Sequence, residues 1–314
     1  MDIAERIDGL LAAGEAPRLH GLVVVRDGQV ELERYGAGDD FRLNDPLGHV
    51  TFGPDVAHDI RSVTKSVVAL LYGAALGDGL VPGPAEPLLP AFPAYADLAA
   101  GKEHLTVEHA LTMTLGLDWN EDVPYTSTAN SELAMEEAPD RYRYVLGRPL
   151  VEEPGKRWRY CGGASALLGK LIADGAGVPL EEFARERLFG PLGMPFEWMA
   201  NRGVAMAASG LRLRPRDLAE LGSLVLDGGR GLVPQGWIAE MLRPRVRIAE
   251  GFEYGYQWYV SPGHWVAAIG NGGQRILVAP GSRLVVAVTA GDYEEFEQPS
   301  AAAVLREALR GEGG

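Results

Sequence analysis

The stretch Ile60-Arg61-Ser62-Val63-Thr64-Lys65-Ser66-Val67-Val68-Ala69-Leu70-Leu71-Tyr72-Gly73-Ala74-Ala75-Leu76 decides how the rest of the chain is interpreted. Its apolar residues recur with a period close to 3.6, which predicts one buried helix with Asp59 as its N-cap. Ser62 and Lys65 then fall in the first turn, on one face. A lysine amine kept neutral by burial or by nearby cations can take the proton of such a serine and make it a nucleophile. The positive end of the helix would also favour an oxyanion beside the Ser62 backbone N–H.

The same spacing has a plainer interpretation. Ser62 could simply cap the helix while Lys65 extends into solvent. S-x-x-K is a short pattern that occurs by chance, so the motif alone does not decide between the two.

Composition narrows the class of protein. A chain of 314 residues has room for about two domains, and 46% hydrophobic with 23% charged residues is typical of a globular protein. The excess of 43 acidic over 29 basic residues gives a net charge of −14, which argues against nucleic acid or an anionic membrane as a partner. A single cysteine, Cys161, excludes an internal disulfide and a multi-cysteine metal site. The oligomeric state is left open.

The N-terminal residues 1–8 are charged and amphipathic, unlike a signal peptide. Apolar runs stay well below the roughly 18 residues that a membrane span needs. We therefore expect a cytoplasmic protein.

Strands are predicted near both ends of the chain. Residues 21–26 and 29–35 form a hairpin around Asp27-Gly28, and residues 36–58 are expected to be a loop. Three further strands, 265–269, 275–279 and 284–288, and a last helix at 299–310 follow late in the chain.

The middle of the chain is mainly helical, with helices expected at residues 107–113, 163–175, 180–189, 215–226 and 235–242. This order predicts an α/β (α+β) protein whose antiparallel sheet is built from both termini. Its domains would be residues 1–76 with 205–314, and a mainly helical insertion at 77–204, with the active site at their interface.

Two further stretches carry possible chemistry. Tyr160 follows a Pro-Gly turn and precedes Gly162-Gly163, so its phenol could be fixed beside a pocket and transfer a proton, although it could equally pack under the loop. Residues 268–274, Ala-Ile-Gly-Asn-Gly-Gly-Gln, end a strand; their glycines would let a substrate approach a backbone N–H, or would simply form a hairpin turn.

Together these stretches resemble the S-x-x-K serine hydrolase superfamily: class C β-lactamases, penicillin-binding D-alanyl-D-alanine carboxypeptidases, and their esterase and 6-aminohexanoate-dimer hydrolase relatives. The resemblance runs from about residue 20 to 290 and implies a β-lactamase/transpeptidase-like fold. It also includes the stretches 111–119, 188–194, 209–211, 214–218 and 254–258.

The resemblance implies a role for each motif. Ser62 would be the acylated nucleophile, Lys65 its base, and Tyr160 the tyrosine of a Y-x-N motif that passes a proton to the leaving group. The oxyanion hole would combine the backbone N–H of Ser62 with that of Asn271, which Gly270 and Gly272 flank. The substrate would be a small ester or amide.

Two departures from the family pattern bear on the expected substrate. Gly162 replaces the asparagine of Y-x-N, and Ala268-Ile269-Gly270 replaces the K-T-G or H-T-G motif, whose cation would recognise a carboxylate. Arg275 could substitute only if it points into the cleft. An esterase or small-amide hydrolase is therefore favoured over a β-lactamase or carboxypeptidase, and a catalytically weak binding module remains an alternative.

Other chemistries find no support. The six histidines lack metal-ligand spacing, and no nucleotide-binding motif or G-x-S-x-G elbow occurs, so no metal or cofactor is expected. His58, near Ser62, is expected to bond to the backbone, and Cys161 to be a small buried thiol.

Overall fold

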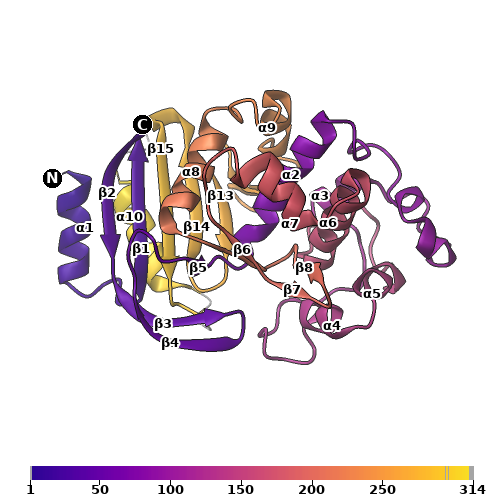
Figure 1. The fold of residues 1–314 in the computed structure, drawn as a ribbon, viewed down its shortest axis with the longest axis horizontal. Coiled ribbons are helices and arrows are strands. Elements are labelled where there is room, and N and C mark those ends of the chain that lie inside the picture. Colours follow the sequence, from indigo (N-terminus) through magenta and orange to yellow (C-terminus); the bar gives the residue numbers. More distant parts are fainter. Residues whose placement is uncertain (1, 294, 296, 311–314) are drawn as a thin grey trace.

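The main sheet joins the two ends of the chain (Figure 1). The computed structural model describes residues 2–293, 295 and 297–310, and over these it shows one eight-stranded antiparallel sheet. The order is β10-β11-β12-β13-β14-β15-β1-β2, where the strands are β10 (Val246–Ala249), β11 (Phe252–Tyr254), β12 (Tyr259–Ser261), β13 (Trp265–Gly270), β14 (Gln274–Ala279), β15 (Leu284–Ala290), β1 (Leu19–Arg26) and β2 (Gln29–Tyr35).

Strand β1 is apolar throughout because both faces of the sheet are covered. Leu22 and Val24 contact the apolar cluster formed with α1 (Ile3–Ala12) and α10 (Pro299–Ala308). Val23 and Val25 belong to the larger cluster on the opposite face, which includes α8 (Pro215–Leu226). The predicted hairpin of β1 and β2 and the sheet built from both ends are confirmed.

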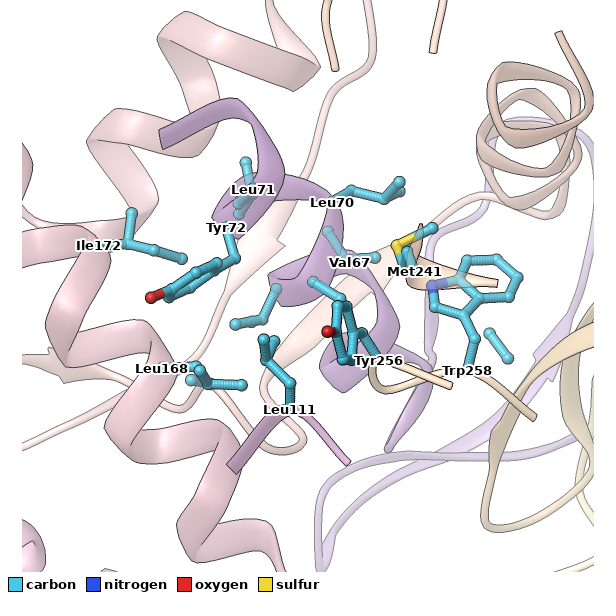
Figure 2. Packing of buried hydrophobic residues seen from close by; sticks show 14 of the residues in the cluster. Val67, Leu70, Leu71, Tyr72, Leu111, Leu168, Ile172, Met241, Tyr256 and Trp258 are labelled. Atoms are coloured by element: carbon cyan, nitrogen blue, oxygen red, sulfur yellow. The ribbon is translucent and has the colours of Figure 1, made fainter. Parts of the chain in front are cut away.

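Helix α2 (Val63–Gly77) runs through the middle of the larger cluster, as Figure 2 shows. Its side chains Val67, Leu70, Leu71 and Tyr72 lie among residues from several other elements, which include Leu111, Leu168, Ile172, Met241, Tyr256 and Trp258. Thirteen consecutive residues, Val63 to Ala75, are buried, so this helix is covered by protein on every side.

The remaining helices include those predicted near residues 107–113, 163–175, 180–189 and 235–242, and two further helices within residues 131–147 that were not predicted. They are α3 (Val107–Leu111), α4 (Ser131–Glu137), α5 (Arg141–Gly147), α6 (Gly162–Ala176), α7 (Leu180–Ala184) and α9 (Gln235–Met241), with short 3-10 or π turns at Leu89–Ala91, Pro93–Leu98, Arg185–Phe189 and Pro280–Ser282. The antiparallel sheet with its inserted helical region is confirmed, whereas the residue boundaries proposed for the two domains stay predictions.

The prediction of a loop at residues 36–58 was wrong. The chain there forms a two-stranded hairpin, β3 (Ala37–Arg42) and β4 (Asp45–Thr51), and a short strand, β5 (His58–Asp59). The hairpin escaped prediction because most of its side chains are exposed, so apolar alternation is missing. Its inward residue Asp40 is instead paired with Arg212, 2.7 Å apart, from β9 (Leu211–Leu213).

Shorter strands complete the described fold. Strand β9 pairs with β5 and with β6 (Glu197–Trp198), and β7 (Ala200–Asn201) pairs with β8 (Val204–Ala205). Among the described helices, none combines the length and apolar character needed to cross a bilayer. The cytoplasmic location stays a prediction.

The contact of α8 with the sheet gives a testable prediction about stability. A Cβ added at Gly222 would collide with Val285 and lie 2.9 Å from Ile276 Cγ2, whereas one at Gly9, inside α1, would meet nothing within 4 Å. We expect Gly222→Ala to lower the free energy of unfolding by about 1–3 kcal/mol through overpacking. Gly9→Ala, the matched control, should raise it by up to about 1 kcal/mol. Urea unfolding measures both; equal effects would contradict the packing described.

Candidate active site

Ser62 occupies the N-cap position of α2, one residue before the helix begins. Its hydroxyl makes no capping hydrogen bond, so the plainer interpretation of Ser62 as a cap fails. The N-cap assigned to Asp59 was also wrong: its carboxylate accepts the backbone N–H groups of Arg61 (3.0 Å) and Leu43 (2.7 Å). Asp59 thus fixes the turn that presents Ser62 and ties it to the β3–β4 hairpin.

Lys65 is buried, with 1% of its surface exposed, and does not extend to solvent. Its Nζ donates to Ser62 Oγ at 3.1 Å, to Glu132 Oε2 at 3.1 Å and to the Ala208 carbonyl at 2.8 Å. An ammonium has three N–H donors, so each has one acceptor here. The serine and the lysine of the motif are therefore in contact, as their spacing predicts.

Tyr160 lies beside this pair. Lys65 Nζ stands 4.9 Å from the centre of its ring. Burial raises the pKa of Tyr160 well above its ordinary value, with the neighbouring Tyr259, Glu121 and Glu132 adding to the rise, while a hydrogen bond with Ser62 lowers it. The phenol is consequently protonated at neutral pH and placed to donate or relay a proton.

The third motif crosses the start of α2. Strand β13 ends at Gly270, where an added Cβ would lie 2.5 Å from the Ile60 carbonyl and 3.2 Å from Arg61 Cβ, so only glycine permits this approach. Asn271 follows and lines the same cleft as Ser62. Gly272 has a φ of +82°, and a side chain there would collide with the Tyr293 ring.

The cleft in front of Ser62 combines apolar walls with charges of both signs. Its lining residues are Leu43, Asn44, Arg61, Ser62, Tyr125, Glu132, Leu133, Glu136, Met206, Ser209 and Asn271. Among these Arg61 is the cation, held by Asp59 at 3.2 Å and stacked over Tyr293. Arg275 does not fill that role, because its buried guanidinium donates to the carbonyls of Gly270 and Gln274, each at 2.8 Å.

Two acids at the site, the buried Glu132 and the half-buried Glu121, were not predicted from the sequence. Glu132, from the first turn of α4, contacts Lys65; Glu121 accepts the Gly162 N–H at 2.5 Å and the Tyr125 hydroxyl at 2.9 Å. Burial, and then the charge of Glu132, raise the pKa of Glu121 to about 7. No spacing rule links residues 121 and 132 to a lysine at 65, so the sequence offered no signal for this contact.

Cys161 is buried and makes a poor nucleophile, since burial raises the pKa of its thiol. Over residues 2–293, 295 and 297–310 no three His, Cys, Asp or Glu side chains are arranged to hold a metal ion.

Comparison with known proteins identifies the family of this chain. The model of the family described as Beta-lactamase matches residues 6–310. The chain belongs to the Beta-lactamase family. The 6-aminohexanoate-dimer hydrolase of Paenarthrobacter ureafaciens is 26% identical to it, over 90% of this chain and 75% of the relative.

Solved structures with the same fold include EstCE1, a hydrolase with promiscuous acyltransferase activity, at a TM-score of 0.76, 19% identity and 98% coverage of both chains. The octameric penicillin-binding protein homologue from Pyrococcus abyssi has a TM-score of 0.74 and 21% identity, covering 99% of this chain and 77% of the homologue. This Beta-lactamase-family protein is a serine hydrolase, as the resemblance implied.

A buried imidazole pair supports the segment that leads into Ser62. His58 Nε2 lies 2.9 Å from His20 Nδ1, and His58 Nδ1 lies 2.9 Å from the Asp59 carbonyl, which confirms the predicted backbone bond. His20 stacks on Phe52, with ring centres 4.2 Å apart. Burial lowers the pKa of His20 to about 4 and that of His58 to about 3, although Asp40 opposes both shifts.

These lowered pKa values predict acid sensitivity. An unfolded histidine titrates at 6.5, so between that pH and about 4 the unfolded chain binds more protons than the folded one. Stability is therefore complete above pH 6.5 and falls with the pH, by roughly 1–2 kcal/mol per histidine at pH 5. His20→Gln should flatten this dependence in urea unfolding series, whereas His264→Gln, at an exposed position, should leave it unchanged. An unaltered slope in His20→Gln would contradict the assignment.

Proposed function

We propose that the protein hydrolyses an ester or a small amide through an acyl-enzyme on Ser62. The observation that carries this proposal is the 3.1 Å contact between Ser62 Oγ and the buried Lys65 Nζ, at a cleft that Asn271 also lines. A serine hydroxyl needs a base within hydrogen-bond reach, and Lys65 meets that requirement in its amine form.

In the acylation step, Ser62 Oγ attacks the acyl carbonyl as its proton passes to Lys65. The developing oxyanion would be bound by the backbone N–H groups of Ser62 and Asn271, with the N-terminus of α2 adding a favourable dipole. The proximity of Gly270 to Ile60 supports this arrangement, because it brings the end of β13 against the residues that precede Ser62.

The leaving group then needs a proton. Tyr160, protonated and placed beside Lys65, is suited to pass the proton of Lys65 to the alkoxide or amine that departs. A water molecule activated by the same groups would release the acyl chain from Ser62 and restore the free enzyme.

The charges of the cleft bear on the choice of substrate. Glu132 and Glu136 line it, already paired with Lys65 and Arg141, and the third motif supplies no cation to bind a substrate carboxylate. Arg61 is already paired with Asp59. These features favour neutral esters and small amides over β-lactams and carboxylate-bearing peptides. A binding module without turnover is also disfavoured, because this chain keeps Ser62, Lys65 and Tyr160 and its relatives include hydrolases.

Substitution of the serine and the lysine tests the mechanism. We expect Ser62→Ala to abolish hydrolysis of p-nitrophenyl butyrate and labelling by a fluorophosphonate, and Lys65→Ala to lower kcat/KM by about 10³-fold or more. Ser66→Ala is the matched control, because Ser66 lies one turn further along α2, where its hydroxyl donates to the Gln257 carbonyl at 2.6 Å. Labelling that persists in Ser62→Ala, or an inactive parent enzyme, would refute the proposal.

Substrate preference gives a separate prediction. Because Arg61, the cation among the described residues that line the cleft, is paired with Asp59, kcat/KM for nitrocefin should be at least about 100-fold below that for p-nitrophenyl butyrate. Parallel steady-state assays measure the ratio. Comparable turnover of the two substrates would restore the β-lactamase alternative.

A further inference from the structure

The position that carries an asparagine in the Y-x-N motif is filled here by a side chain from another element. Gly162 begins α6, and a Cβ added to it would collide with Glu132 Oε2 and lie 2.9 Å from Glu132 Cδ and 3.1 Å from Cγ. The carboxylate therefore occupies the space that a side chain at residue 162 would take. The Glu132 carboxylate thus takes the place of the asparagine side chain that residue 162 lacks.

Glu132 is held rigidly in this place. Its backbone N–H donates to Asn130 Oδ1 at 2.9 Å, the N-cap of α4, and only 4% of the residue is exposed. Its Oε2 lies 3.1 Å from Lys65 Nζ. The other acceptors of Lys65, Ser62 Oγ and the Ala208 carbonyl, are poor proton acceptors, so Glu132 is the one contacting group that can take a proton from the ammonium.

The surroundings keep Glu132 charged in the resting site. Although its burial opposes ionisation, Lys65 and hydrogen bonds with Glu121 and Ser209 lower the pKa of Glu132 overall, while the pKa of Glu121 rises to about 7. The titratable groups that face the pair are Glu121 and Tyr125 before α4, Glu136 on α4, Tyr160 and Cys161 before α6, and Tyr259 on β12.

We propose that Glu132 is a positioning residue that replaces the second-motif amide: it holds Lys65 against Ser62 as an ammonium and accepts a proton from it to generate the base. This inference rests on the proposed function. The proton moves from Lys65 Nζ to Glu132 Oε2, and the resulting amine takes the Ser62 proton as Oγ bonds to the acyl carbon. Lys65 then supplies the leaving group through Tyr160 as the acyl bond breaks, and Glu132 returns its proton to Lys65.

This proton relay predicts how kcat/KM depends on pH in the parent enzyme and in Glu132→Gln. The parent enzyme does not have to release a proton to solvent to form the Lys65 amine, so it stays active below neutral pH. In Glu132→Gln the acceptor is gone, and Lys65 has to lose its proton to solvent. We expect the acidic limb of kcat/KM for p-nitrophenyl butyrate to move upward by about one pH unit or more, a loss of about tenfold or more at pH 6. Glu132→Asp should restore part of the activity at that pH.

Gly162→Ala offers an independent way to move the carboxylate without removing it. Its Cβ should displace Glu132 from Lys65 and shift the acidic limb in the same direction, and the double variant with Glu132→Gln should shift it no further than Glu132→Gln alone. Glu136→Gln is the matched control, since Glu136 lines the same cleft but pairs with Arg141 at 3.0 Å. Thermal unfolding confirms that each variant is folded.

The outcomes separate this inference from the proposed function. Three results would each overturn the role of Glu132 while ester turnover stands. The acidic limb could stay in place or move downward in Glu132→Gln, the shifts could be additive in the double variant, or Glu136→Gln could shift the limb equally. If the parent has no turnover, the proposed function fails, and NMR of the lysine side chains tests the contact by itself. The Nζ resonance of Lys65 should differ between the parent and Glu132→Gln, and an unchanged resonance would refute the pairing.

Discussion

The burial of one positive charge organises this protein. Lys65 lies on a helix that is buried on every side, and an unpaired ammonium there would be strongly unfavourable. Its three hydrogen bonds come from three different places: Ser62 before α2, Glu132 at the start of α4, and the Ala208 carbonyl before β9. The buried ammonium of Lys65 therefore has all three acceptors only when these three segments meet at its nitrogen atom. The hydrogen bonds that stabilise this buried charge also bring the residues of the candidate site together.

Much of the fold follows from apolar periodicity. Helices α2, α6 and α8 and strands β1, β13, β14 and β15 carry their pattern in the residues that face the two clusters. The hairpin of β3 and β4 does not, because its strands bury little and are held by their backbone ladder and by the Asp40–Arg212 pair. A segment without an apolar face leaves no periodic signal, whatever structure it adopts.

The candidate site likewise has residues that could be predicted from the sequence and residues that only the structure reveals. The contact of Ser62 with Lys65 was predictable from local helical spacing. Turn and glycine patterns singled out Tyr160 and the stretch that holds Asn271, but their roles beside Ser62 came from the resemblance, because they lie elsewhere in the chain. Glu132 reaches Lys65 across 67 residues, and only its three-dimensional contact reveals it. The glycine at residue 162 was visible from the sequence as a departure from the family pattern; its cause, a carboxylate already in that space, was not.

The place of β1 in the sheet has a consequence for the way this protein is made. Val24 pairs with Leu32 on one side and with Val286 on the other, so one edge of β1 finds its partner more than two hundred and fifty residues later. During synthesis that edge of the apolar strand β1 stays unpaired until β15 has left the ribosome. A chain that stops before β15 therefore exposes an apolar strand edge through which copies can associate.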